Sequence, residues 1–148
     1  MSAARWVIAN DHAGLALKPA LTQVLTVLGL PVDDLGTTSS ESVDYADFAH
    51  RACESIVSGR YEHGILVCGT GVGISIAANR HRGIRAALCN DLYTARMARL
   101  HNDANVLCLG ARVVGAGLAE EILRAFVQTP FEAGRHRTRI AKIDGATG

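Results

Sequence analysis

The stretch EHGILVCGTGVGISIAANR, residues 62–80, decides the fold class of this chain. Its apolar run 65–67 is typical of a short buried strand, and the alanine-rich run 74–78 predicts a helix. Between them stand three glycines at alternate positions: Gly69, Gly71 and Gly73. A strand, a glycine loop and a helix start aim bare backbone N–H groups at one place, where the helix dipole adds positive potential. The stretch therefore predicts an anion-binding turn.

Cys68 stands at the mouth of this loop. We expect the neighbouring N–H groups to stabilise its thiolate. The alternative is an ordinary strand-to-helix turn with a buried cysteine, a common environment for that residue. Three glycines in five residues exceed what a turn needs, so a functional loop is favoured.

The loop does not match the common nucleotide-binding motifs. The pattern G-x-G-x-x-G requires a glycine where Ile74 stands, and the Walker A pattern requires a lysine that the loop lacks. A nucleotide-binding domain is therefore disfavoured.

Composition indicates one ordinary globular domain spanning residues 1–148. Hydrophobic residues make up 49%, charged residues 20%, and the net charge is +1, which gives no reason to expect a nucleic-acid partner. No apolar run approaches the roughly 20 residues of a membrane helix, so no membrane partner is expected. The four cysteines form no C-x-x-C pair, which suits reduced thiols in the cytoplasm.

Apolar runs typical of strands alternate with helical patterns along the chain. Strands are expected at 6–9, 31–35, 64–67, 84–88 and 105–109, and helices at 15–28, 45–57, 74–78, 92–100 and 118–127. This alternation predicts a five-stranded parallel sheet covered on both faces, a three-layer α/β/α, Rossmann-like domain.

Polar residues gather where these elements end. Asp11 and His12 follow the first strand, Cys68 the third and Arg112 the fifth, while His101 and Asn102 end a helix. Ligands of such sheets bind beyond the carboxyl ends of the strands, so we expect these residues at one edge. Each has a plainer alternative: Asp11 as a helix cap, His101 as a favourable charge at a helix end, Arg112 as a surface charge, and Tyr45 as a helix start. Asn102 is also a candidate for a left-handed conformation.

The basic tail carries Arg135 and Arg139, four residues apart and so on one side of a helix. Such a pair could clamp a phosphate, or it could be a solvated basic tail. The tail could also reach a second subunit.

Six motifs together resemble the ribose-5-phosphate isomerase B family, whose wider family includes galactose-6-phosphate and allose-6-phosphate isomerases. They are NDHAG at 10–14, DY at 44–45, CGTGVGISIAAN at 68–79, HNDxN at 101–105, GxRVVG at 110–115 and GRHxxR at 134–139. The resemblance spans nearly the whole chain. It implies an aldose–ketose isomerase that converts D-ribose 5-phosphate and D-ribulose 5-phosphate in the pentose phosphate pathway, without a metal or organic cofactor.

The resemblance also implies roles for residues. Cys68 is the base that moves a proton between C1 and C2, His101 opens the sugar ring, and Thr70 assists. Sugar contacts are implied for Asp11, Tyr45 and Asn102, and phosphate contacts for His12, Arg112, Arg135, His136 and Arg139. We expect the backbone N–H groups of the loop, at Gly69, Gly71, Val72 and Gly73, to bind the substrate by stabilising the negative charge of the enediolate. Some family members use a glutamate base instead, but Asn79 near the helix favours the thiolate here. The implied assembly is a homodimer whose tail crosses to the partner, and dimers can pair into tetramers.

Two alternatives stay open. One is an isomerase of a six-carbon sugar phosphate or of an unphosphorylated sugar, because the motifs do not fix sugar length. The other is a non-catalytic sugar-phosphate binding module, which would not explain a thiol at the loop.

Overall fold

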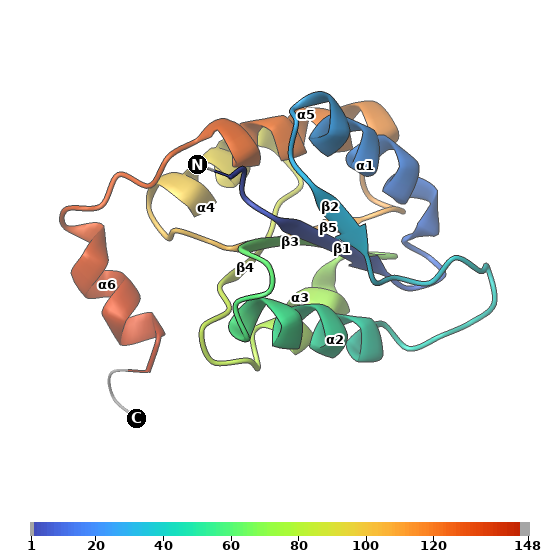
Figure 1. Ribbon diagram of the computed structural model, residues 1–148, viewed down its shortest axis with the longest axis horizontal. Helices are drawn as coiled ribbons and strands as arrows, with labels where there is room; N and C mark the ends of the chain where they lie inside the picture. Colours follow the sequence, from blue (N-terminus) through green and yellow to red (C-terminus); the bar gives the residue numbers. More distant parts are fainter. Residues whose placement is uncertain (1, 146–148) are drawn as a thin grey trace.

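A computed structural model of the chain describes residues 2–145 as one five-stranded parallel sheet with helices on both faces (Figure 1). The strands are β1 (Trp6–Asn10), β2 (Val32–Asp34), β3 (His63–Cys68), β4 (Ala86–Leu88) and β5 (Val106–Gly110). Their order is β2-β1-β3-β5-β4. The three central strands are apolar on both faces because helices cover both, as parallel sheets require. The predicted α/β/α fold is confirmed.

The helices divide between two hydrophobic cores. They are α1 (Lys18–Val27), preceded by the 3-10 turn η1 (Leu15–Leu17), α2 (Tyr45–Val57), α3 (Val72–Ala78), α4 (Leu92–Leu100), α5 (Ala116–Gln128) and α6 (His136–Ile143). Helices α1, α4 and α5 pack on one face of the sheet, and α2 and α3 pack on the other (Figure 1). Successive strand residues alternate between the cores, so Ile8 joins the first and Val7 the second.

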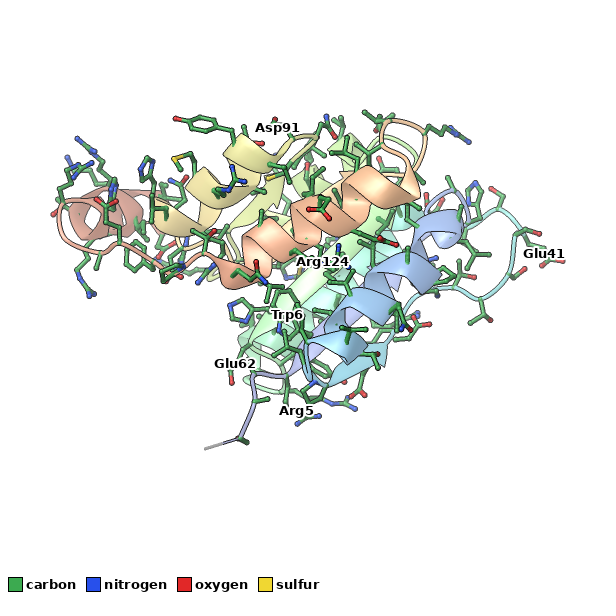
Figure 2. All side chains as sticks on the ribbon, turned by 90° about the horizontal axis from the view of Figure 1, so that it is seen from above. Arg5, Trp6, Glu41, Glu62, Asp91 and Arg124 are labelled. Carbon is green, nitrogen blue, oxygen red and sulfur yellow. The ribbon has the colours of Figure 1, made fainter. Side chains whose placement is uncertain are left out.

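The expected element boundaries hold within a few residues. Helices α2 and α4 match their expected ranges, and Asp91 caps α4 by accepting the N–H of Thr94 at 2.7 Å (Figure 2). The basic tail forms α6, which stands apart from the three layers beside β4 (Figure 1).

The strand order places a switch point between β1 and β3. The chain leaves β1 to form β2 on one side and returns to form β3 on the other. The register pairs Asn10 with Val67 and Cys68 with Gly110, so the segments that follow β1, β3 and β5 share one edge. That edge is where a ligand of such a sheet binds.

Across residues 2–145, no helix has both the length and the apolar character that crossing a membrane would take.

Candidate active site

The glycine loop folds back onto the sulfur of Cys68. The N–H of Gly71 donates to Cys68 Sγ at 3.1 Å, and Cys68 itself is 4% exposed. Gly71 adopts φ +79, and a Cβ there would lie 2.5 Å from the Leu88 side chain, so only glycine fits. The N–H of Val72 donates to Thr70 Oγ1 at 3.2 Å. One loop amide, that of Gly71, therefore contacts the thiol, and the amide of Val72 is bonded to Thr70 instead.

The other three cysteines lie in environments that keep them protonated. Burial raises the pKa of Cys53 to about 12 and that of Cys89 to about 11. Burial also holds the pKa of Cys108 well above its ordinary value. Burial thus favours the protonated form of these three thiols, and Cys68 differs from them in accepting an amide N–H from a glycine loop.

Asp11 lies beside this loop, directly after β1. Its N–H donates to the carbonyl of Val67 at 3.2 Å, which carries the strand pairing one residue further. Its carboxylate Oδ1 accepts the N–H of Gly14 at 2.9 Å. This bond closes the turn 11–14 and caps no helix, because the residues at the caps of η1 and α1 are Gly14 and Leu17, so the helix-cap alternative for Asp11 is wrong. Asp11 is 5% exposed.

His12 is oriented by a contact that the sequence did not indicate. Its Nδ1 accepts the backbone N–H of Val43 at 3.1 Å, so the neutral ring carries its proton on Nε2. Val43 belongs to the loop 35–44, which projects from the body and carries Glu41 (Figure 2). Lys18, only 7% exposed, anchors this loop by donating to Thr37 O at 2.6 Å and pairing with Asp34 at 2.9 Å.

Tyr45 and Arg112 flank the loop in space left by glycines. A Cβ at Gly73 would lie 2.6 Å from the Tyr45 ring, and one at Gly69 would lie 3.1 Å from the Arg112 guanidinium. The N–H of Arg112 also donates to Gly69 O at 2.9 Å. Together these residues form what we call the thiol cluster: Asp11, His12, Tyr45, residues 68–73 and Arg112.

The expectation that His101 and Asn102 share this edge within one chain is wrong. Helix α4 starts beyond the carboxyl end of β4 and runs back against the strand direction, ending at His101. There Arg85, which precedes β4, donates from Nε to Asn102 O at 2.9 Å. His101 therefore lies at the amino edge of the sheet. Five strand residues at about 3.3 Å each put that edge about 16 Å from Cys68. The positive φ expected at Asn102 falls on Asp103 instead.

The basic tail joins His101 at that opposite edge. The rings of His101 and His136 stack with centroids 4.4 Å apart and planes 18° apart. Glu132, which the sequence reasoning missed, donates its N–H to Leu100 O at 2.9 Å and pairs with Arg135 at 3.2 Å. We call the group at this edge the histidine cluster: His101, Asn102, Arg135, His136 and Arg139.

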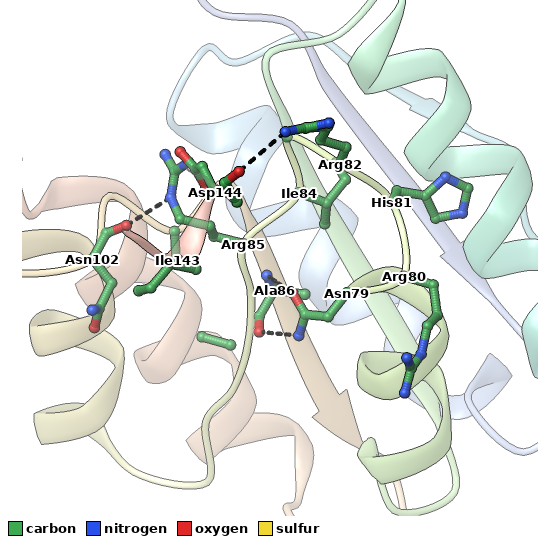
Figure 3. A pocket seen from close by; sticks show the side chains of 14 residues that line it. Asn79, Arg80, His81, Arg82, Ile84, Arg85, Ala86, Asn102, Ile143 and Asp144 are labelled. Carbon is green, nitrogen blue, oxygen red and sulfur yellow. Dashed lines mark hydrogen bonds and ion pairs between the residues drawn. The ribbon is translucent and has the colours of Figure 1, made fainter. Parts of the chain in front are cut away.

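A cavity of about 600 Å³ separates α6 from the edge strand β4 (Figure 3). Arg82, Ile84 and Asn102 line it on the body, and Ile143 and Asp144 line it on the tail. Arg85 spans the gap to Asp144 at 2.9 Å. The cavity borders the histidine cluster, and Cys68 is not among its lining residues.

Asn79, which replaces a possible glutamate base, has a structural role here. Its amide donates to Ala86 O at 2.9 Å and accepts the Ala86 N–H at 2.8 Å, so it completes the backbone bonding of edge strand β4 (Figure 3).

Comparison with known proteins agrees with this fold and with the earlier resemblance. Residues 6–143 match the family described as Ribose/Galactose Isomerase. Ribose-5-phosphate isomerase B of Escherichia coli is 47% identical over 133 residues, covering 90% of this chain and 89% of that protein. D-erythrulose-4-phosphate isomerase of Pectobacterium atrosepticum is 42% identical over 137 residues, covering 92% and 90%. The crystal structure of a ribose 5-phosphate isomerase from Thermotoga maritima is 52% identical, with a TM-score of 0.92 and coverage of 95% of this chain and 97% of that one. The chain therefore belongs to the ribose/galactose isomerase family.

Proposed function

We propose that this isomerase interconverts D-ribose 5-phosphate and D-ribulose 5-phosphate, a step of the pentose phosphate pathway. The observation that carries the proposal is Cys68 Sγ held against a glycine loop at the switch point of the sheet. The relatives from E. coli and T. maritima, at 47% and 52% identity, are named for ribose 5-phosphate.

Cys68 acts as the general base in this proposal. Its thiolate removes the proton from the carbon beside the carbonyl, and the resulting enediolate takes the proton back at the neighbouring carbon. The amides of residues 69–73 stabilise the negative charge, and losing one such donor costs roughly 3 kcal/mol of barrier. The near-complete burial of Cys68 suits this step, because a preorganised base must be kept from water.

Ring opening precedes proton transfer and needs a second acid–base group. An imidazole suits it near neutral pH, and we assign the step to His101 with Thr70 assisting. Because His101 lies about a strand's length from Cys68 of its own chain, we propose that a second copy supplies it. A two-fold homodimer would then build two identical sites, each from one thiol cluster and one histidine cluster.

The position of α6 supports such an assembly. The helix stands away from the body as an arm (Figure 1). A cavity lies between it and β4 (Figure 3). Exposed apolar side chains line both surfaces that would meet: Ile143 on the arm is 59% exposed, and Val72 and Ile76 on α3 are 48% and 53% exposed. A partner's α3 and glycine loop seated against the arm would cover these side chains.

Phosphate recognition follows from the charges of both clusters. His12 has its Nε2–H directed away from Val43, and Arg112 lies over Gly69. We propose that Arg135, His136 and Arg139 of the second copy complete the phosphate site. Guanidinium groups bind phosphate through paired, charge-assisted hydrogen bonds.

The alternatives to this proposal differ mainly in the number of carbon atoms in the sugar. The P. atrosepticum relative, at 42% identity, is named for a four-carbon sugar phosphate, which favours testing other lengths as a second candidate. A panel of ribose 5-phosphate, galactose 6-phosphate, allose 6-phosphate, erythrulose 4-phosphate and free ribose compares kcat/KM directly. The proposal is wrong if any other sugar exceeds ribose 5-phosphate.

Solvent deuterium exchange separates an enzyme from a binding module. Incubation with ribose 5-phosphate in D₂O should place deuterium on the carbon next to the carbonyl, observed by NMR. A module that binds the sugar phosphate without catalysis would leave that position unlabelled.

A reducing compartment, the cytoplasm, is part of the proposal. All four cysteines, Cys53, Cys68, Cys89 and Cys108, are free, and the proposed base requires a free thiol.

A further inference from the structure

Three potential metal ligands meet where α6 leaves the body. His101 ends α4, Glu132 lies in the connection to α6, and His136 begins α6. One donor atom from each lies within 4.8 Å of the others. Within this group, His136 Nε2 and Glu132 Oε1 are 3.4 Å apart, the spacing of neighbouring ligands around one tetrahedral ion.

An independent observation concerns His136. Its side chain is 5% exposed, and its Nε2 has no hydrogen-bond partner among the residues that the structure describes. A buried ring nitrogen without a partner is unfavourable and rare. This nitrogen faces the Glu132 carboxylate, so it is aimed at the place that an ion would occupy.

We propose that His101, Glu132 and His136 bind a divalent transition-metal ion of the Zn²⁺ class, with water in the remaining position. Two imidazoles and one carboxylate form a recurrent zinc donor set, whereas Mg²⁺ and Ca²⁺ prefer oxygen ligands. The Glu132 side chain is 41% exposed and leaves a path for the ion. A backbone bond from Glu132 to Leu100 holds the carboxylate beside the end of α4.

Binding requires two rearrangements. The nitrogen lone pairs lie in the ring planes, so rings stacked at 18° cannot both address one ion, and the His101 ring must turn out of the stack. Glu132 Oε1 also accepts from Arg135 at 3.2 Å, so the ion either displaces Arg135 or binds the other carboxylate oxygen. The ion would thus withdraw His101 and disturb Arg135 together. Since the proposed function uses both, the metal acts as an inhibitor; this consequence rests on that function.

A Co²⁺ titration of the chelator-treated protein tests the site itself. One ion per chain should bind with visible absorption bands of nitrogen and oxygen ligands, and Zn²⁺ should displace it. Glu132→Gln should weaken binding about tenfold or more. Glu121→Gln is the matched control, because Glu121 forms the same i,i+3 pair with Arg124 at 3.0 Å, and it should bind as the wild type does. A near-ultraviolet sulfur-to-cobalt band, or equal affinity in all three proteins, overturns the proposal.

Inhibition is measured separately from binding. Zn²⁺ should inhibit the wild type and Glu121→Gln at the same concentrations, whereas Glu132→Gln should keep its turnover at correspondingly higher Zn²⁺. If Co²⁺ binds as expected but Zn²⁺ inhibits Glu132→Gln and wild type equally, the inhibitory role is wrong. If the chain fails to isomerise ribose 5-phosphate, the cobalt spectra still decide whether the site exists.

Discussion

Gly71 donates its backbone N–H to the sulfur of Cys68 at 3.1 Å. Cys89 has the opposite arrangement, with its sulfur donating to Ala87 O at 3.8 Å. A sulfur that accepts an amide is stabilised when it carries negative charge, whereas a sulfur that donates must keep its proton. Iodoacetamide should therefore alkylate Cys68 ahead of the other three cysteines, and ribose 5-phosphate should slow that reaction. Peptide mapping that finds Cys53 or Cys89 labelled first would contradict this assignment.

Replacing the sulfur should remove catalysis without removing binding. Cys68→Ala should lower kcat about 100- to 10,000-fold, the usual contribution of a general base, while binding of ribose 5-phosphate persists. Cys53→Ala, a buried cysteine of α2 outside the site, is the control and should keep near-normal kcat. Steady-state kinetics and calorimetry provide the two readings, and a folded Cys68→Ala enzyme with near-normal turnover would show that another group is the base.

A site shared between two copies can be tested by mixing two inactive variants. Cys68→Ala and His101→Ala chains, unfolded together and refolded, should form mixed dimers in which one site has both native side chains. Random pairing should restore about one quarter of the wild-type sites, since half of the dimers are mixed and each has one intact site. Separately refolded variants are the control. Recovery no greater than that of the controls would mean that Cys68 and His101 do not combine across two chains.

The thiol cluster was predictable because parallel strands share an edge. The carboxyl ends of β1, β3 and β5 lie side by side whatever path the connecting helices take. Asp11, Cys68 and Arg112, at or just after these ends, could therefore be grouped from the order of elements alone. The position of His101 was missed because it ends a helix rather than a strand. A crossover helix between parallel strands runs back along the sheet, and its end lies at the opposite edge.

Contacts made by irregular segments could not be predicted. Val43 reaches His12 from a loop with no periodic pattern, and Glu132 reaches the end of α4 through one backbone bond. No local spacing indicates either contact, because both depend on where a long connection settles after the core has packed.

The contact of Val43 with His12 gives a prediction that separates the two ring nitrogens. His12→Asn places an oxygen near the position of Nδ1, so it should keep the Val43 bond and lose only the group at Nε2. His12→Gln places its amide nearer Nε2 and should release the loop 35–44. We expect Asn to raise KM for ribose 5-phosphate without changing proteolysis of that loop, and Gln to make the loop more sensitive. Equal protease sensitivity of the two variants would contradict the tautomer inferred here.

Replacement of glycine by alanine should have opposite effects on stability at two positions, Gly14 and Gly117. A Cβ at Gly14 would lie 2.2 Å from the backbone oxygen of Val67, and neither backbone can yield easily. Gly14→Ala should destabilise the fold by about 1–3 kcal/mol. Gly117 in α5 has nothing within 4 Å of its Cβ position, so Gly117→Ala should stabilise by up to about 1 kcal/mol. Urea unfolding measures both, and a neutral Gly14→Ala would disprove the tight contact between the end of β1 and β3.

The titration of His63 should make the free energy of unfolding depend on pH. It stacks on Trp6 at 4.8 Å, and burial, assisted by the charge of Arg99, lowers its pKa below the ordinary value of 6.5. Below pH 6.5 the unfolded chain therefore binds a proton that the folded chain does not, so acidification favours unfolding. The contribution of His63 to the free energy of unfolding is therefore fully present above pH 6.5 and is lost as the pH falls towards the pKa of the folded state. His63→Phe keeps an aromatic ring on Trp6 but cannot titrate, so its unfolding free energy should fall less between about pH 7.5 and about pH 5 than that of the wild type.

A second histidine, His81, should add to the same pH dependence, because burial and the charge of His50 lower its pKa too. The unfolding free energy of His63→Phe should therefore still fall somewhat on acidification, and it should fall less in the double variant with His81→Gln. Identical slopes in the wild type and His63→Phe would show that His63 titrates as freely in the folded chain as in the unfolded one.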